Sequence, residues 1–268
     1  MQNVIDMENI TYNCKKRILE ISNIYGCYVG SAFSSLDILV YLYTKHLNIS
    51  KSTLDSEERD YFILSKGHAV SALYSLFVEM KWIDKENLKH DEFYQHPSSL
   101  IPGIEFHSGS LGHGLAVSSG IALDIVKNKK SNQVFTLLGD GELNEGSVWE
   151  TLNIISHHKL LNLTIIIDRN KYQANYKTEE LLSLEPLKEK FEAFNFHVIE
   201  IDGHNFKELN QSFNMKTDKP KVIIAHTKRG NGINSIESNW EKWFMKTTDQ
   251  EYRSLINELE RNNENEVW

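Results

Sequence analysis

A carboxylate between two glycines, directly after an apolar segment, is the feature of this sequence best suited to chemistry. Residues 134–138 read Val-Phe-Thr-Leu-Leu, and Gly139-Asp140-Gly141 follows them. The glycines permit a tight turn and close approach of a ligand, and a helix starting near Glu145 would offer N–H groups to a phosphate. Asp140 could then hold a hard cation such as Mg²⁺ that bridges to that phosphate. Taken alone, a Gly-Asp-Gly sequence is more often an ordinary turn.

A second oxygen donor follows the next apolar segment. Asp168-Arg169-Asn170 comes after residues 163–167, and Asn170 lies 30 positions after Asp140. One strand–helix–strand unit fills that length, so both side chains can meet at the same sheet edge. This pairing favours a metal-and-phosphate site over the alternative in which Asp168 caps a turn or helix. Two other phosphate motifs are excluded, because the glycines are followed by no Lys-Ser/Thr pair and no strand precedes a G-x-G-x-x-G.

The elements that must position these residues alternate along the chain. Short apolar segments predict strands at 61–65, 134–138, 163–167, 196–201 and 221–226. Helical spacing of apolar residues predicts helices at 5–22, 35–47, 69–81, 115–127 (a buried helix), about 145–158, 184–194 and 249–261. Nearly all-apolar strands separated by helices predict an α/β fold, with a parallel sheet flanked by helices on both faces. No repeat or linker divides the chain, so residues 1–268 are expected to form one domain.

Composition excludes several classes of protein. The chain has 268 residues, with 29 basic and 37 acidic side chains, which argues against nucleic acid as a partner. No segment approaches the roughly 18 apolar residues of a membrane span, and the N-terminus lacks the pattern of a signal peptide. Cys14 and Cys27 make neither a disulfide framework nor a zinc set. We therefore expect a cytoplasmic protein that acts on small molecules, with no membrane partner.

Gly-Asp-Gly followed at this interval by asparagine resembles the thiamine-diphosphate signature. More narrowly, from about residue 10 to its C-terminus the chain resembles the N-terminal, diphosphate-binding domain of the transketolase family. The motifs that carry the resemblance occur in the family's order: Ser65-Lys-Gly-His-Ala69, His96-Pro97, Pro102-Gly-Ile-Glu105, Gly109-Ser-Leu-Gly-His-Gly114, Gly139-Asp-Gly-x-x-x-Glu-Gly146, Asp168-x-Asn170-Lys171 and Ala225-His-Thr-Lys-x-Gly230.

The resemblance assigns roles to particular residues. It implies that thiamine diphosphate is the cofactor and that Mg²⁺, replaceable by Ca²⁺ or Mn²⁺, binds Asp140, Asn170 and the main-chain carbonyl of Tyr172. It implies cofactor contacts from His68, Gly109, Ser110, Leu111, Gly141, Glu142, Asn170 and His226. The implied catalytic residues are His68, His96 near the thiazolium, and Glu145. Glu145 would link two active sites across a subunit interface, and its alternative role is a first-turn acid favoured by the helix dipole.

The resemblance also implies a partner chain. The sequence ends where the first domain of a full-length transketolase would end, so the pyrimidine-binding domain, with the glutamate that ionises the cofactor, is expected on another subunit. The sequence is then either a truncated piece of a longer enzyme or, as we expect, the diphosphate-binding subunit of a split enzyme. It would be active only with a C-terminal transketolase-like subunit, in an α2β2 assembly.

Two departures from the family concern the substrate. Cys27-Tyr-Val-Gly-Ser31 has Tyr28 where the family has a histidine, and Asn239-Trp-Glu-Lys-Trp-Phe244 has Phe244 at a second such position. The leading hypothesis is transfer of a two-carbon ketol unit from a ketose to an aldehyde. One alternative is acyl transfer or decarboxylation with a 2-oxo acid such as pyruvate, because each lost hydrogen bond to a donor hydroxyl costs about 1–3 kcal/mol. The other is a non-catalytic structural subunit, which the intact Asp140, Asn170 and His68 disfavour.

Overall fold

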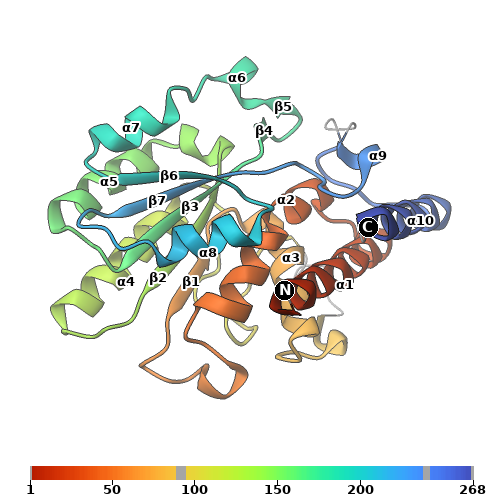
Figure 1. The fold of residues 1–268 in the computed structure, drawn as a ribbon, viewed down its shortest axis with the longest axis horizontal. Helices are drawn as coiled ribbons and strands as arrows, with labels where there is room; N and C mark the ends of the chain where they lie inside the picture. Colours follow the sequence, from red (N-terminus) through yellow and green to blue (C-terminus); the bar gives the residue numbers. More distant parts are fainter. Residues whose placement is uncertain (1, 89–94, 238–241, 267–268) are drawn as a thin grey trace.

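The central element is a parallel sheet, seen edge-on in Figure 1. The computed structural model describes residues 2–88, 95–237 and 242–266. Within them, five strands pair in the order β1-β2-β3-β7-β6, and every pair is parallel. The strands are β1 (Tyr61–Leu64), β2 (Val134–Gly139), β3 (Leu163–Arg169), β6 (His197–Asp202) and β7 (Lys221–His226). A separate antiparallel hairpin consists of β4 (Tyr172–Gln173) and β5 (Tyr176–Lys177).

Helices cover both faces of this sheet, because successive strand residues point to opposite sides. In β2, Phe135 and Leu137 pack in one core, whereas Val134 and Leu138 pack in the other. The first core is covered by α1 (Gln2–Ile24), α2 (Val29–Tyr41), α3 (Val70–Glu79) and α8 (Phe206–Asn214). The second is covered by α4 (His113–Lys127), α5 (Gly146–His158) and α7 (Leu187–Ala193). The predicted α/β fold with helices on both faces is confirmed.

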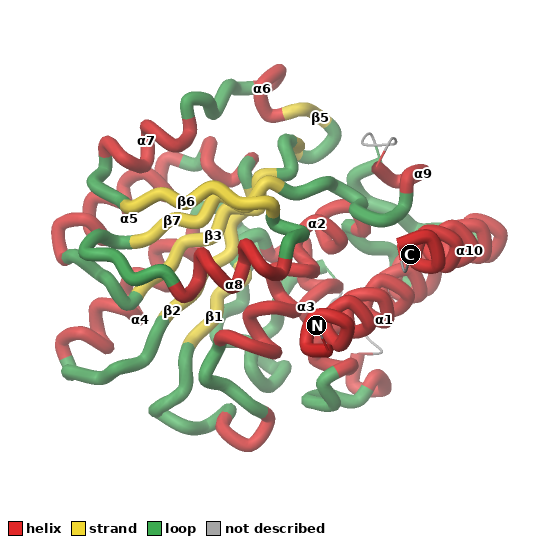
Figure 2. The backbone as a smooth tube through the Cα atoms, in the orientation of Figure 1, coloured by secondary structure: helices red, strands yellow, loops and turns green. Residues whose placement is uncertain are grey.

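The last long helix packs against the first. α10 (Asp249–Glu266) runs beside α1 at the edge of the molecule farthest from the strands (Figure 1, Figure 2). Leu255 and Leu259 of α10 are buried in the core that contains α1, and Lys16 forms an ion pair of 3.0 Å with Glu260. The short helices α6 (Thr178–Leu181) and α9 (Asn234–Glu237) lie in the connections.

The structure differs from the prediction in several elements. The helix predicted at 35–47 starts earlier, at Val29, and Leu42–His46 continues it with a wider turn. The helix predicted from residue 184 starts only at Leu187, directly after Pro186, which is disfavoured in a helix interior. α8 was not predicted, although Asn205 caps it by accepting hydrogen bonds from two backbone N–H groups.

The helix predicted to be buried, α4, is only half buried. Its apolar residues Ala116 and Val126 are exposed, while Leu115, Ala122 and Ile125 pack inside. In the described ranges, no helix is both long and apolar enough to cross a bilayer.

Candidate functional site

Three strand ends meet at one edge of the sheet and surround a cavity. The strand register places Gly139 of β2 beside Asp168 of β3, and Asp168 beside Ala225 of β7. The predicted meeting of these loops is therefore observed. The cavity has a volume of about 160 Å³ and is lined by Ser31, Lys66, His68, Leu111, Gly139, Asp140, Gly141, Glu142, Asn170, Tyr172, Gln173, Ala174, Arg229 and Trp243.

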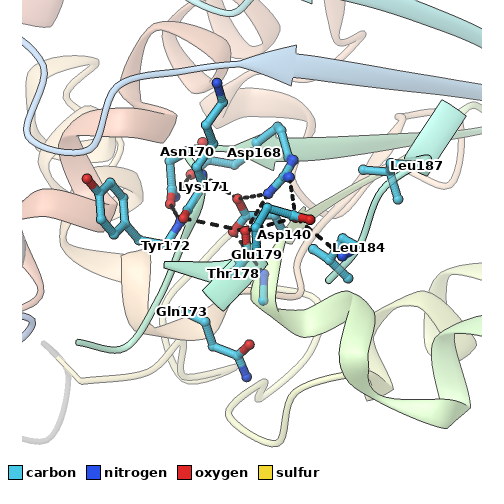
Figure 3. Close-up of polar contacts among 12 residues, drawn as sticks. Asp140, Asp168, Asn170, Lys171, Tyr172, Gln173, Thr178, Glu179, Leu184 and Leu187 are labelled. Atoms are coloured by element: carbon cyan, nitrogen blue, oxygen red, sulfur yellow. Dashed lines mark hydrogen bonds and ion pairs between the residues drawn. The ribbon is translucent and has the colours of Figure 1, made fainter. Parts of the chain in front are cut away.

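Asp140 is a buried carboxylate held in a fixed orientation. It accepts hydrogen bonds from the backbone N–H group of Gly141 at 2.8 Å and from that of Lys171 at 2.5 Å (Figure 3). Arg169 donates a third bond to it at 3.1 Å. Burial and the neighbouring charge of Asp168 raise the pKa of Asp140 to about 6, against the opposing effect of Arg169. A further positive charge would stabilise the ionised form, as a metal ligand requires.

Asn170 supplies the second oxygen beside the cavity. Its Oδ1 accepts one hydrogen bond, from the Tyr172 backbone N–H at 3.0 Å, and its amide nitrogen donates to Asp168 at 3.2 Å. Carboxylate, amide and carbonyl oxygens are ligands that suit Mg²⁺, which usually keeps non-protein oxygens as well. Within the described part of the chain, no cluster of three or more His, Cys, Asp or Glu side chains could hold a metal. The donor set therefore fits a hard cation shared with a phosphate.

Asp168 anchors the loops beneath the cavity. It accepts a hydrogen bond from Ser34 at 2.6 Å, and it also contacts the Lys66 ammonium and the Thr227 hydroxyl. Burial alone would raise the pKa of Asp168, but Lys66 and these hydroxyls lower it below its usual value. Asp168 lies in β3 and its carboxylate oxygens bind side chains from distant segments. Its alternative role as a turn or helix cap is therefore wrong.

Two cations line the cavity and were not assigned from the sequence. Lys66 lies inside the predicted segment 65–69, and Arg229 occupies the unspecified position of the segment 225–230. Arg229 donates one hydrogen bond to the Ala174 carbonyl at 2.6 Å and lies 5.5 Å from the centre of the Tyr172 ring. Its other terminal nitrogen, Nη2, is buried and has no hydrogen-bond partner in the described structure. An unpaired buried guanidinium N–H is costly, so the cavity fits an anion such as a diphosphate.

His68 lies at the other side of this cavity and is electrically neutral. Burial, and then the positive charge of Lys66, lower the pKa of His68 to about 3. Its Nε2 is 2.8 Å from the Ser31 hydroxyl. His68 can therefore exchange hydrogen bonds with a ligand without adding charge.

An aromatic wall, defined here as Tyr28, Trp243 and Phe244, packs around His68. The Tyr28 ring centre is 4.7 Å from Trp243 and 5.3 Å from Phe244, and Trp243 is 5.8 Å from His68. Two hydrogen bonds of 2.9 Å between the backbones of Cys27 and Met245 hold the two segments together. Both family departures thus belong to one cluster. Asn239 of the second motif lies outside the described residues.

The remaining predicted residues divide into two groups. Those that line the cavity are His68, Leu111, Asp140, Gly141, Glu142, Asn170 and Tyr172. The Glu142 carboxylate is occupied by protein donors, since it accepts from the backbone of Gly112 at 2.7 Å and of Gly139 at 3.2 Å. Ser65 also donates to it. In this arrangement Glu142 joins two loops that border the site.

The other group lies outside the cavity lining. The ring of His96 lies over Gly109, where an added Cβ would be 3.3 Å from it, and Ser110 is exposed next to that contact. Burial and the neighbouring His107 lower the pKa of His96. Glu145 is exposed at the N-cap position of α5, and its side chain makes no capping bond within the described residues. His226 is exposed on the face of β7 opposite to the one that carries the buried Ala225, and its Nε2 is 2.9 Å from the Glu200 carboxylate.

Known proteins are similar to this chain in sequence and in fold. The domain described as "Transketolase, thiamine diphosphate binding domain" matches residues 17–255. The chain is 34% identical to one subunit of the apulose-4-phosphate transketolase of Phocaeicola vulgatus, over 91% of this chain and 90% of that protein. It is 31% identical to a subunit of the 6-deoxy-6-sulfo-D-fructose transketolase of Clostridium sp., over 96% and 97%. The crystal structure of Campylobacter jejuni transketolase matches with a TM-score of 0.83 and 26% identity, over 98% of this chain and 43% of that one.

Proposed function

The chain belongs to the transketolase family, and from that premise we propose that it is the diphosphate-binding subunit of a ketol transferase. With thiamine diphosphate and Mg²⁺ it would move a two-carbon unit from a ketose donor to an aldehyde acceptor. The observation that carries this proposal is the cavity itself. Two oxygen donors, Asp140 and Asn170, lie in it together with two cations, and one of these, Arg229, has a buried nitrogen that lacks an acceptor.

The side chains in the cavity suggest which residues would bind the cation and which would bind the diphosphate. Asp140, Asn170 and the Tyr172 carbonyl would hold the cation, while Lys66 and Arg229 would neutralise the diphosphate. When bound, the cofactor supplies the electron sink that the donor's C–C cleavage needs. The protein supplies position and charge. Asp168 fixes Lys66 through their buried ion pair.

A proton-transfer role is proposed for His96. Its lowered pKa keeps the ring neutral near neutral pH, so it can accept a proton or donate a hydrogen bond. Glu145, exposed at the start of α5, remains our candidate for a contact between subunits.

A partner chain is part of the proposal. Two relatives are named as subunits of transketolases, and the chain covers 43% of the Campylobacter jejuni enzyme. We infer that a second chain carries the pyrimidine-binding domain, in an α2β2 assembly. Light scattering of the co-purified chains tests this inference, because it gives the mass and stoichiometry of the complex.

The aromatic wall favours a second candidate function. Its Trp243 lines the cavity, and Phe244 has no hydrogen-bonding group where the family has a histidine, which suits a 2-oxo acid donor such as pyruvate better than a polyhydroxylated ketose. In this candidate the cofactor site is unchanged and an acyl group is transferred.

One experiment separates these functions. The complex of both chains, with cofactor and Mg²⁺, is given a ketose phosphate or pyruvate together with an aldehyde, and the products are identified by proton NMR. Ketol transfer yields a hydroxymethyl ketone two carbons longer than the acceptor, whereas acyl transfer from pyruvate yields a methyl ketone. Asp140→Ala should remove metal-dependent cofactor binding and leave the fold intact. Wild-type cofactor affinity in this variant, or no product from any donor, would contradict the proposal.

A further inference from the structure

Arg169, at the end of β3, is a buried arginine that has no part in the function proposed above. Its side chain is only 2% exposed. The preceding residue, Asp168, bonds to Ser34 of α2 on one side of the sheet. Because successive strand residues point to opposite faces, Arg169 points to the other side. There it meets α6 and the connection between α6 and α7.

Both terminal nitrogens of Arg169 are fully used by the protein. Nη1 donates to Oδ2 of Asp140 at 3.1 Å and to the Thr178 hydroxyl at 2.7 Å. Nη2 donates to Glu179 at 2.8 Å and to Glu185 at 2.9 Å; Thr178 and Glu179 are drawn with Asp140 in Figure 3. Each terminal nitrogen of a guanidinium carries two N–H groups, so neither has one left for a ligand. Arg169 therefore acts on the site through Asp140.

These bonds leave the Asp140 carboxylate with one free position for a cation. Each oxygen of a carboxylate has about two lone pairs that can accept a bond. Oδ2 accepts from Arg169 at 3.1 Å and from the Lys171 backbone N–H at 2.5 Å, so both of its lone pairs are occupied. Among the described residues, Oδ1 accepts only from the Gly141 backbone N–H, at 2.8 Å. A cation can therefore bind Oδ1 but cannot bind both oxygens together.

We propose that Arg169 is a positioning residue that restricts Asp140 to binding through one oxygen and thereby shifts the preference of the site from Ca²⁺ toward Mg²⁺. Mg²⁺ requires a compact octahedral set of ligands, which a carboxylate bound through one oxygen suits. Ca²⁺ accepts more ligands and readily takes both oxygens of a carboxylate. This inference rests on the proposed function, because it concerns the cation that would accompany the diphosphate.

The charge of Arg169 would disfavour a nearby cation if nothing balanced it. Glu179 and Glu185 provide that balance on the side away from Asp140, with side chains that are 39% and 54% exposed. One guanidinium is thus shared among three carboxylates. Arg169 can therefore stay bonded to Asp140 while a divalent cation binds the same carboxylate.

The test is calorimetric titration of the two-chain complex with MgCl₂ and with CaCl₂, at saturating thiamine diphosphate. The quantity compared is the Kd for Ca²⁺ divided by the Kd for Mg²⁺. Arg169→Met frees one lone pair of Oδ2 and loosens Asp140, so Mg²⁺ affinity should fall by about tenfold. Ca²⁺ can use the freed oxygen and should lose little affinity, so the ratio should fall by about the same factor.

Three further variants separate this role from other effects. Arg59→Met is the matched control, because Arg59 is 12% exposed and forms a 2.6 Å ion pair with Glu105 away from the cavity; it should keep the wild-type ratio. Glu179→Gln combined with Glu185→Gln leaves the bond from Arg169 to Asp140 in place, so both cations should bind more weakly at an unchanged ratio. Arg169→Lys keeps the charge but not the guanidinium fork. Its ratio should fall by a smaller factor, and it replaces Arg169→Met if that variant is too unstable to titrate.

The outcomes distinguish this inference from the proposed function. A wild-type ratio in both Arg169 variants would overturn the role of Arg169 and leave the cation site standing. A fall in the ratio of the double glutamine variant as large as that in Arg169→Met would also overturn it, because Arg169 would then only link the loops. If the wild-type complex bound neither cation, the proposed function itself would fail.

Discussion

Replacing Arg229 with methionine should weaken thiamine-diphosphate binding strongly while changing the fold little. In the structure one terminal nitrogen of Arg229 is bonded to the Ala174 carbonyl, and the other, Nη2, is buried without a partner. A diphosphate oxygen would give Nη2 a charge-assisted hydrogen bond worth about 1.5–3 kcal/mol. Losing that bond corresponds to an increase of roughly 10- to 150-fold in Kd.

The stability of the apo chain should change much less than cofactor affinity. Arg229→Met loses the bond to Ala174 but also removes an unpaired buried N–H. The two effects are each about 1 kcal/mol and of opposite sign. We therefore expect the free energy of unfolding to stay within about 1 kcal/mol of the wild-type value, which separates a binding defect from a folding defect.

The assay is calorimetric titration of the two-chain complex with thiamine diphosphate at saturating Mg²⁺. Lys228→Met is the matched control, because it removes the same charge from the adjacent, exposed position. A Kd for Arg229→Met within twofold of the wild type would refute the assignment. An equal loss in Lys228→Met would mean that only the overall charge of the loop matters.

Four further substitutions test other residues of the site. Lys66→Met leaves Asp168 buried without its cation and should lower the free energy of unfolding in urea by about 3–5 kcal/mol; a loss below about 1 kcal/mol would contradict the buried pair. Because the pKa of His68 is about 3 in the folded chain and about 6.5 when unfolded, the unfolded state takes up the proton first as pH falls. Stability should therefore fall below pH 6.5 by up to about 1.4 kcal/mol per pH unit, and the profile of His68→Gln should be flatter by that amount; parallel profiles would refute it. Phe244→His should raise kcat/KM for a ketose relative to kcat/KM for pyruvate, and an unchanged ratio would contradict the role of Phe244 in donor choice. His96→Ala should lower kcat more than it lowers cofactor affinity, and full turnover in this variant would contradict a role in proton transfer.

The fold and the centre of the site were predictable because they depend on local apolar patterns and on the number of residues between motifs. Strand β2 is buried on both faces, which its apolar sequence indicates. The 30 residues between Asp140 and Asn170 fit one strand–helix–strand unit, and parallel pairing then brings their loops together. These inferences need no knowledge of side-chain packing.

Other parts of the site depend on contacts between distant segments. Trp243 meets Tyr28 only because the backbone of Met245 bonds to that of Cys27, and no spacing in the sequence encodes this register. The unpaired nitrogen of Arg229 likewise follows from how its loop packs on the β4–β5 hairpin.

The position of His226 could have been inferred from strand alternation. Ala225 is buried in the α1 side of the core, so the next residue in β7 must point to the other face, where it contacts Glu200. The cofactor contact predicted for His226 came from the family resemblance, which did not take this alternation of strand residues into account. His226 does not line the cavity.

The packing of α10 on α1 has a consequence for the order in which the chain acquires its structure during synthesis. Lys16 and Glu260 are separated by 244 positions, so a ribosome completes α10 long after α1 has emerged. Until then, the apolar surface that Leu255 and Leu259 later cover remains open to solvent and to other nascent chains. Contacts between such distant segments also slow folding. We expect the chain to need protection by chaperones during translation, and release before α10 is made should yield aggregates rather than a smaller folded domain.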